Sequence, residues 1–441
     1  MKSIEQIAAE LAGYDPNSLR ADKVNLFLDE LVSPIVEIET VALFDGLNRV
    51  LANDIISPIS VPPHDNSAMD GFAFDGTQLA TGESLKLKVI GTALAGKAWQ
   101  GTVGLGECLK IMTGAIMPEG LDTVAPQEMV VLNSDKTQIT ITPKILQRGD
   151  NRRKAGEDLQ QGSPALLKGT HLTPAALGLI ASLGLPTVAV YRKIRVAYFS
   201  TGDEILSLGD SPREGAVYDS NRYTVFGLLT RMGCEVIDMG VVRDEPTLLE
   251  AAFAKAATVA DAIITSGGVS VGEADYTRAM MKKLGAESGG VAFWRIAMRP
   301  GRPMAVGRIS SSQHKYSLNS YENGSASLFG LPGNPVAVMV TFLAFVRPAL
   351  LRMMGSNATT PPLLKARSTE AIRKKPGRTE YQRGTVSTSP EGTLIVKTTG
   401  NQGSGVLSSM VQANGLIVLH HDQSSVAIGD EIDVMMFDGV I

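Results

Sequence analysis

The sequence predicts a multidomain protein that combines an open α/β sheet with two β-rich regions. Residues 195–354 alternate between short apolar strands and helical stretches, and residues 61–150 form short alternating segments separated by glycines. The tail after Pro361 and Pro362 returns to residue-by-residue alternation. Strands alternating with helices are typical of a parallel sheet with crossover helices, whereas alternation of single residues indicates half-buried strands. A chain of 441 residues has room for about two to four domains.

The first 60 residues are predicted to be mainly helical. Spaced apolar positions over residues 3–32 follow a helical period that Pro16 interrupts, and a second helical stretch is expected over residues 40–51. Pro58, Pro62 and Pro63 then mark a change of pattern. The glycine-rich stretch that follows, with strands expected at 85–90 and 137–141, looks inserted between helical flanks.

The α/β region has a regular order of elements. Strands are expected at 196–200, 235–239, 262–265, 291–296 and 304–309, and helices at 223–232, 247–257, 275–284 and 335–354. This order predicts an open parallel sheet with crossover helices. The polar residues 310–327 are expected to form a mobile loop rather than a binding element. In the tail, strands expected at 381–386, 393–396, 416–419 and 431–435 favour a small β-barrel or sandwich.

Composition narrows the class of function. Lys and Arg total 41 against 45 Asp and Glu, a net charge of −4, and no basic stripe predicts a nucleic-acid partner. Glu5 and Glu10 interrupt the N-terminus where a signal peptide needs an apolar core. The apolar run 336–346 is shorter than the about 20 residues of a membrane span. Cys108 and Cys234 are far apart, which predicts neither a disulfide framework nor a zinc site. We therefore expect a cytoplasmic protein without a membrane partner.

The residues that follow the predicted strands are the candidates for a functional site. In an open parallel sheet, ligands bind at the carboxyl ends of the strands. The segments at these ends are rich in carboxylates, glycines and arginines, so these groups should converge on one edge. The segments are 200–204, 240–244, 265–275, 298–303 and 330–335.

Two glycine-rich turns precede predicted helices, and both are candidates for phosphate binding. They are Ser266-Gly267-Gly268 and the Pro-Gly-Asn-Pro segment from Pro332 to Pro335. Backbone N–H groups at such turns, together with the positive end of a helix dipole, hold phosphate. The alternative is that these glycines only make tight turns. Neither turn is a Walker motif, and no Gly-x-Gly-x-x-Gly follows a strand, which disfavours a nicotinamide enzyme.

Several carboxylates fall on the same edge, and they would need a cation if phosphate binds beside them. Mg²⁺ takes one or two carboxylates together with phosphate oxygens and water, so it is the expected ion. The alternative is that Asp244 caps its helix and that the others are turn residues. The carboxylates are Asp203, Glu204, Asp244, Glu273 and Asp275.

Three arginines add positive charge near this edge, at Arg295, Arg299 and Arg302. Their forked N–H groups suit a tetrahedral oxyanion, although a surface role for any one of them is an alternative. The five histidines show no ligand spacing, and we expect His420 and His421 to face solvent.

These motifs resemble those of the molybdopterin molybdenumtransferase family, which includes the E domain of gephyrin. The resemblance covers essentially the whole chain and is carried by residues 65–71, 111–114, 155–158, 200–204, 218–221, 266–276 and 331–335. It implies a fold of four parts. These are a discontinuous helical N-terminal domain at 1–60 and 151–194, a β-rich inserted domain at 61–150, an α/β molybdopterin-binding domain at 195–358, shared with pterin adenylyltransferases, and a C-terminal β-barrel at 359–441.

The resemblance also implies the site residues. The functional carboxylates of the family fall on Asp70, Asp158, Glu204, Asp244 and Asp275. Because Asp244 and Asp275 follow adjacent predicted strands, we expect these two to be the Mg²⁺ ligands. The substrate-binding positions fall on Thr113, Arg153, Ser266, Gly267, Gly268, Ser270, Arg295, Arg299, Pro332, Pro335, Arg383 and Ser404. This chain differs from the family pattern in having Arg instead of Lys at 295, 299 and 302, which keeps the charge but replaces a point cation by a planar fork. Residues 310–327 also form a longer stretch than the family pattern has.

The family's reaction joins molybdate to adenylylated molybdopterin and releases AMP, which makes these two the implied substrates. The implied partners are a second copy in a homodimer, the pterin adenylyltransferase and the acceptor molybdoenzymes. In that dimer, Asp70 and Thr113 of one subunit would face Asp244, Asp275 and Arg383 of the other.

Two alternative functions are consistent with the same fold. The first is pterin adenylyltransferase activity, against which the flanking domains and the barrel argue. The second is a non-catalytic scaffold that binds proteins, against which the retained Asp244 and Asp275 argue, since a scaffold needs no carboxylate cluster.

Overall fold

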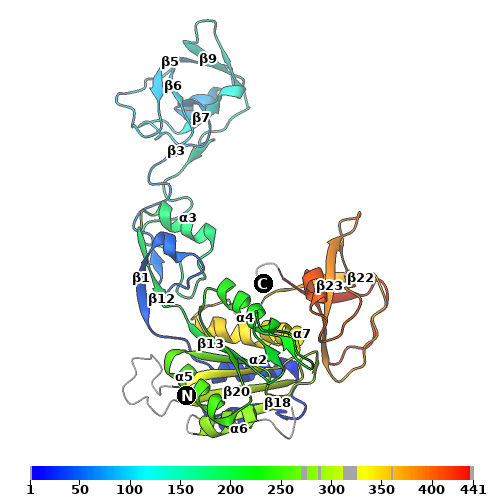
Figure 1. The fold of residues 1–441 in the computed structure, drawn as a ribbon. Helices are drawn as coiled ribbons and strands as arrows, with labels where there is room; N and C mark the ends of the chain where they lie inside the picture. The colour runs from blue at the N-terminus through cyan, green and yellow to red at the C-terminus, as the bar shows by residue number, and fades with distance from the viewer. Residues whose placement is uncertain (1, 270–275, 287–289, 311–324, 359–360, 438–441) are drawn as a thin grey trace.

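The computed structural model describes residues 2–269, 276–286, 290–310, 325–358 and 361–437. The chain forms a body with a central sheet, a β-barrel beside it, and an arm that carries a β-rich module away from the body (Figure 1). The multidomain α/β plus β architecture expected from the sequence is confirmed.

The central sheet of the body has six strands in the order β16-β13-β17-β21-β20-β18. They are β13 (Arg195–Thr201), β16 (Glu235–Val242), β17 (Ala262–Ser266), β18 (Val291–Arg295), β20 (Pro303–Ser310) and β21 (Ser325–Leu331). The first four in this order are parallel, as predicted, and β18 runs in the same direction, but β20 is antiparallel to both of its neighbours, β21 and β18. The prediction of an all-parallel sheet is therefore wrong near one edge, because the connection 296–302 between β18 and β20 is shorter than the dozen or more residues that a parallel crossover needs.

Strand β21 was not predicted, because its first residues belong to the polar stretch 310–327. Ser310 ends β20 and Ser325 begins β21, and residues 311–324 of that expected loop lie outside the described residues.

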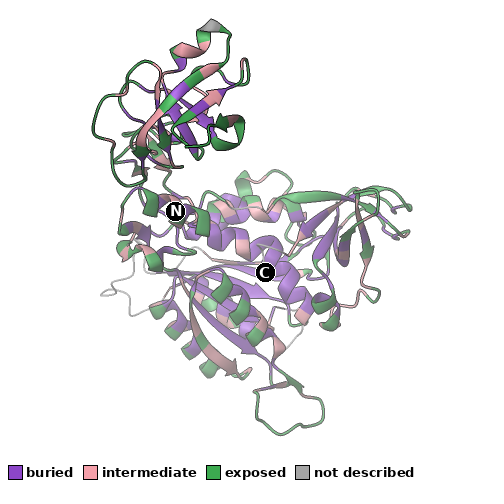
Figure 2. Cartoon of the chain, turned by 90° about the horizontal axis from the view of Figure 1, so that it is seen from above, coloured by how far each residue is buried: buried purple, intermediate pink, exposed green. Residues whose placement is uncertain are grey.

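Helices cover both faces of the sheet, which explains the continuous apolar strands. Val196 and Tyr198 of β13 face a core formed with α4 (Ser220–Arg231), α7 (Pro335–Thr341), a π-helical turn (Phe342–Val346) and α8 (Arg347–Met353). Ala197 and Phe199 face the opposite core, formed with α5 (Pro246–Val259) and α6 (Tyr276–Gly285). Figure 2 shows this buried interior across the body.

The N-terminal helices pack on the same sheet. Helix α1 (Ile4–Glu10) begins with a capping box formed by Ser3 and Gln6, and α2 (Ala21–Leu31) buries Phe27 against Trp294. The predicted break near Pro16 is confirmed, since it falls between the two helices.

The helix predicted over residues 40–51 is wrong. This segment forms β1 (Ile38–Ala42) and a short 3₁₀ turn (Leu43–Gly46), and β1 pairs with β12 (Thr187–Tyr191). A partner almost 150 residues away along the chain overrides the local helical pattern, as tertiary context often does. Helix α3 (Pro174–Ser182), capped by Thr173, packs beside this pair of strands.

Two short ribbons lead outward from there to the β-rich module. They pair β2 (Ile55–Ile56) with β11 (Pro164–Leu166) and β3 (Asn66–Ser67) with β10 (Arg152–Arg153). The module itself is a six-stranded sheet in the order β7-β4-β6-β5-β9-β8, with its own small cores. Its strands are β4 (Gly71–Phe74), β5 (Leu85–Ala93), β6 (Glu107–Ile111), β7 (Thr123–Pro126), β8 (Val130–Leu132) and β9 (Gln138–Ile141).

The tail forms a closed five-stranded barrel, so of the two predicted alternatives the barrel is confirmed. Its strands are β22 (Leu363–Ser368), β23 (Thr379–Thr388), β24 (Leu394–Thr398), β25 (Gly415–Leu419) and β26 (Glu431–Met436). Strand β23 pairs with both β24 and β25, which closes the sheet. The short strand β19 (Met298–Arg299) pairs with the start of β23 and joins the barrel to the body.

The last helical segment of the body is longer than the apolar run 336–346, which was predicted to be too short to span a membrane. Residues Pro335–Met353 form 19 residues with a mean hydropathy of 1.8, enough by length and composition to cross a bilayer. Because 89% of this window is buried inside the fold, the segment is packed as a core helix.

Candidate functional site

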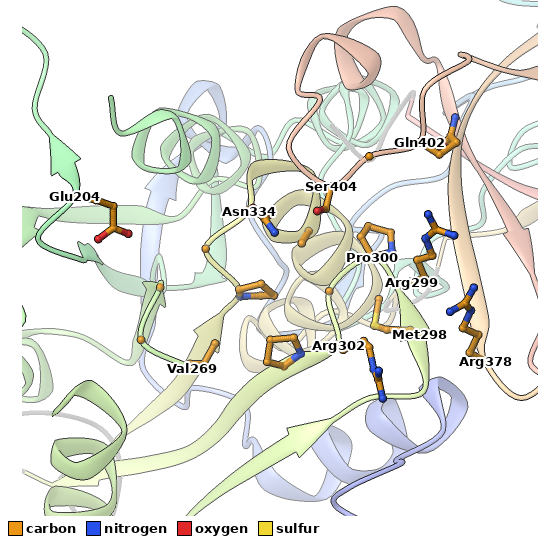
Figure 3. A pocket seen from close by; sticks show the side chains of 18 residues that line it. Glu204, Val269, Met298, Arg299, Pro300, Arg302, Asn334, Arg378, Gln402 and Ser404 are labelled. Carbon is orange, nitrogen blue, oxygen red and sulfur yellow. The ribbon is translucent and has the colours of Figure 1, made fainter. Parts of the chain in front are cut away.

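A cavity of about 750 Å³ lies where the carboxyl edge of the sheet meets the barrel (Figure 3). Its wall on the sheet side comes from the turns after β17 and β21 and from the segment 298–303. Its wall on the barrel side comes from Arg378 and from the loop Gln402 to Ser404. The predicted convergence of strand ends on one edge is therefore found for these segments.

A second cavity of about 450 Å³ adjoins the first one. The two share Glu204, Gly267, Gly333 and Asn334 as lining residues. The second cavity extends along the end of β13 to the start of α4, where Ser200, Thr201 and Asp219–Asn221 line it. Together the two cavities offer room for a ligand longer than a single small anion.

The glycines of the first turn are required by close packing. Gly267 has φ +90° and a Cβ there would lie 2.5 Å from the carbonyl oxygen of Thr201, while Gly268 has φ +64° and a Cβ would overlap Thr277. Both conformations favour glycine. The tight-turn and phosphate-binding interpretations are thus compatible, because Gly267 also lines both cavities and Gly268 lines the larger one.

A buried cluster of three hydroxyl groups lies at the end of β13 and β17. The Tyr198 hydroxyl is 2.6 Å from Oγ of Ser266 and 2.9 Å from Oγ of Ser200, and the two serine oxygens are 3.2 Å apart. Burial raises the pKa of Tyr198, so the phenol stays protonated and can donate. Sequence reasoning included Ser266 but missed Tyr198, because a tyrosine inside an apolar strand reads as core.

Two of the predicted carboxylates have clear places. Glu204 lines both cavities. Asp244 accepts a 2.9 Å hydrogen bond on Oδ1 from Oγ1 of Thr277, and its N–H donates to Oδ1 of Asp203 at 3.4 Å. Helix α5 has Glu245 at its N-cap and no side-chain cap, so Asp244 is not the capping residue of the alternative interpretation.

The predicted metal pair is described only in part. Asp275, Ser270 and Glu273 lie outside the described residues. Within the described part of the chain, no group of three or more His, Cys, Asp and Glu side chains is arranged to hold a metal ion.

The arginines of the 295–302 segment have different positions. Arg299 and Arg302 line the larger cavity, whereas Arg295 lies on β18, where its backbone bonds to Pro16 and Leu19. Arg378, which sequence reasoning missed, lines the cavity from the barrel side. The only sequence signal for it was its basic character close to the barrel strand that carries Arg383.

Arg383 is fully buried in the barrel, behind the loop that lines the cavity. Its Nε donates to Oγ of Ser409 at 2.9 Å, and its Nη2 donates to the carbonyl oxygens of Gly403 at 2.9 Å and Asn401 at 3.2 Å. Burial, and secondarily the charge of Arg299, lowers the pKa of Arg383 to about 10. Ser404 itself lines the cavity, as does Pro332, while Pro335 lines the second cavity.

The predicted residues of the arm and the β-rich module lie apart from these cavities. Asp70 accepts hydrogen bonds on Oδ1 from the N–H of Thr113 at 2.7 Å and from its hydroxyl at 2.8 Å, and these bonds lower the pKa of the Asp70 carboxyl. Asp158 and Arg153 belong to the connecting ribbons, where they contact Val61 and Asn66 through the backbone. The structure thus joins Asp70 to Thr113 at the ends of β4 and β6, in the module that Figure 1 shows held away from the central sheet of the same chain.

Comparison with known proteins places these features in a family. Three family models match in succession: "MoeA N-terminal region (domain I and II)" over residues 20–184, "Probable molybdopterin binding domain" over 197–352, and "MoeA C-terminal region (domain IV)" over 365–437. A molybdopterin molybdenumtransferase of Haemophilus influenzae is 40% identical over 94% of this chain and 97% of its own length. One from a Nostoc species is 34% identical over 90% and 88%.

Solved structures agree with this match. The molybdopterin biosynthesis moeA protein from Pyrococcus horikoshii OT3 superposes with a TM-score of 0.76 at 26% identity, covering 95% of this chain and all of the other. A second structure of such a protein from Pyrococcus gives 0.68 at 30% identity, covering 96% and 99%. Because the three family models match in succession and a relative is 40% identical over nearly the whole chain, this protein belongs to the molybdopterin molybdenumtransferase family.

Proposed function

We propose that this protein is a molybdopterin molybdenumtransferase of molybdenum cofactor biosynthesis, which inserts molybdate into adenylylated molybdopterin and releases AMP. The observation that carries the proposal is the cavity in which a glycine turn, three arginines and the barrel loop face one another. Two relatives are named molybdopterin molybdenumtransferase, and this chain matches them over 97% and 88% of their own length.

The arrangement suits a reaction between two anions. Arg299, Arg302 and Arg378 offset the charge of an oxyanion, and the N–H groups of the glycine turn can receive a phosphate. Positive charge and fixed N–H donors stabilise charge that develops when a phosphoanhydride is cleaved. The second cavity extends the site enough to hold the remainder of a nucleotide-activated pterin.

A magnesium ion is part of this proposal, with Asp244 and Asp275 as its ligands. The described residues offer oxygen donors for such an ion, because the Asp203 carboxylate accepts a hydrogen bond from the backbone N–H of Asp244, and the Asp244 carboxylate lies beside the hydroxyl of Thr277. All-oxygen donors of this kind are what Mg²⁺ prefers, and the bound ion would neutralise phosphate oxygens. The hydrogen bond from Thr277 holds the Asp244 carboxylate in one orientation.

We further propose a homodimer in which Asp70 and Thr113 of one subunit complete the site of the other. The arm carries this pair away from the cavity of its own chain, so a partner subunit is the simplest way to bring them to a cavity (Figure 1). Enclosure between subunits would also exclude water from a reactive pterin nucleotide. A cytoplasmic location, and contacts with the pterin adenylyltransferase and acceptor molybdoenzymes, belong to the same proposal.

One assay separates this function from its two alternatives. Purified protein is incubated with adenylylated molybdopterin, Mg²⁺ and molybdate, and AMP and pterin-bound molybdenum are measured. The proposed function requires both products to appear in equal amounts and only when molybdate is present. Formation of adenylylated pterin from molybdopterin and ATP would indicate an adenylyltransferase, and tight protein binding without either reaction would indicate a scaffold.

A further inference from the structure

A chain of three buried hydroxyl groups ends at the second cavity. Ser200 and Ser266 lie at the carboxyl ends of the paired strands β13 and β17, and both line that cavity. Tyr198 lies two residues before Ser200 on the same face of β13, and its phenol bonds to both serines. All three residues are at most 2% exposed, and Tyr198 lines neither cavity. The phenol therefore lies directly behind two hydroxyl groups of the cavity wall.

The distances between the three oxygens indicate how the protons are shared. Tyr198 is 2.6 Å from Ser266 and 2.9 Å from Ser200. The two serine oxygens are 3.2 Å apart, which is longer than the roughly 2.5–3.0 Å of a good O–H···O bond. Burial raises the pKa of Tyr198, so the phenol keeps its proton. Because a phenol is more acidic than an alcohol, Tyr198 donates to its nearer partner, Ser266, and accepts from Ser200.

This arrangement leaves the proton of Ser266 without a good acceptor inside the fold. Among the described residues, the Ser266 hydroxyl bonds only to Tyr198 and, at the longer distance, to Ser200. Its proton is therefore available to a ligand in the second cavity. Hydrogen bonds that run in one direction along a chain polarise one another, so the last hydroxyl is strengthened as a donor. Such a donor suits an anionic oxygen.

Two further features of this cavity favour a phosphate as the ligand. Ser266 directly precedes the turn Gly267-Gly268, and Gly267 lines the same cavity. The last helical segment of the body begins here, and its N-cap residue Asn334 makes no side-chain cap, so the positive end of the helix dipole faces the cavity. Asp219 also lines the cavity, but its Oδ1 accepts from the N–H of Arg222 as the cap of α4, which offsets part of its charge.

We propose that Tyr198 is a positioning residue, which holds the hydroxyl of Ser266 so that it donates to a phosphate oxygen in the second cavity. The inference rests on the proposed function, under which this phosphate belongs to the adenylyl group of the substrate and to the AMP product. Tyr198 itself touches no ligand, because Ser200 and Ser266 lie between it and the cavity. Without the phenol, the two serines have only each other as partners, and the Ser266 proton turns away from the ligand.

The test is binding of AMP to the full-length protein, measured by isothermal titration calorimetry. Tyr198→Phe removes one oxygen and keeps the ring. We expect it to weaken AMP binding about threefold to tenfold, because the phosphate loses an oriented hydrogen bond. Ser266→Ala removes the donor itself and should weaken AMP binding at least as much. Adenosine has no phosphate, so its binding, followed by ligand-observed NMR, should be the same in Tyr198→Phe and the wild type.

A double variant separates positioning from a general effect on the fold. If Tyr198 acts through Ser266, Tyr198→Phe combined with Ser266→Ala should bind AMP no more weakly than Ser266→Ala alone. A general loss of packing would make the two losses additive instead. The matched control is Tyr14→Phe, because the Tyr14 hydroxyl accepts a 3.0 Å bond from Nε1 of Trp294 but Tyr14 lines neither cavity. Its AMP affinity should equal that of the wild type.

Additive losses in the double variant would overturn the inference, and so would an equal loss of adenosine binding in Tyr198→Phe. Molybdate-dependent AMP release is measured in parallel on the wild type. Release by the wild type, together with unchanged AMP binding by Tyr198→Phe, would refute this inference alone. A loss of AMP binding confined to the phosphate in Tyr198→Phe, without any wild-type turnover, would refute only the proposed reaction.

Discussion

Nη2 of Arg383 donates a 2.9 Å hydrogen bond to the carbonyl oxygen of Gly403, the residue that precedes Ser404 at the cavity wall. The guanidinium is buried in the barrel, and its other bonds to Asn401 and Ser409 hold the same loop and the start of the following helix. The cavity wall on the barrel side is thus shaped by a cation that does not itself line it.

Replacing Arg383 by Lys should damage this wall although the charge is kept. A lysine cannot reproduce three donor directions, so we expect a loss of about 2–3 kcal/mol in the free energy of unfolding. We also expect a higher KM for molybdate with little change in the KM for the adenylylated pterin. Urea unfolding and steady-state kinetics measure the two effects. Equal rises in both KM values would argue against a dedicated oxyanion pocket.

Gly268→Ala should reduce activity through the backbone of the first turn. The residue has φ +64° and its new methyl group would overlap Thr277, so the strain should cost about 1–3 kcal/mol or displace the turn. AMP release is expected to fall at least about tenfold. The control is Gly178→Ala in α3, where nothing lies within 4 Å of the added methyl group. That variant should be more stable by roughly 0.5–1 kcal/mol and fully active.

Asp244→Asn should lower AMP release by two or more orders of magnitude while leaving the fold intact. The amide oxygen can still accept from Thr277, but the charge that holds Mg²⁺ is lost, and each 1.36 kcal/mol of lost stabilisation is a factor of about ten in rate. The Mg²⁺ concentration for half-maximal activity should rise as well. The control is Asp210→Asn in an exposed turn. Among the described residues, the Asp210 side chain accepts a hydrogen bond only from the N–H of Ser207. Near-normal turnover of Asp244→Asn would remove this assignment.

Mixing inactive Asp70→Asn protein with inactive Asp244→Asn protein tests whether sites are shared between subunits. If they are, each mixed dimer carries one doubly damaged site and one intact site, and its activity should reach about half of the wild-type value. The Asp70 carboxylate accepts two bonds from Thr113, which keeps its pKa low and the group ionised at neutral pH, so the Asn variant removes a real charge. A mixture as inactive as its components would place each site within one chain.

The sequence by itself was sufficient for the alternation of strands and helices in the α/β region, apart from β21. Apolar strands such as Val196 to Phe199 are continuous because both faces of the sheet are buried, and this pattern is local and readable. The glycine turn at Gly267 and Gly268 and the carboxylates at the strand ends were found for the same reason, since the ends of parallel strands meet at one edge.

Only the tertiary structure decided the features that depend on distant partners. Residues 38–42 became a strand because β12 lies beside them, and β21 was hidden in a polar stretch that pairs with β20. Arg378 directly precedes β23 and is partly exposed, whereas Arg383 lies within β23 and is buried. The closure of the barrel determines this difference between two arginines five residues apart. Two arginines look alike in a sequence, and the packing around each determines whether its donors serve a loop or a ligand.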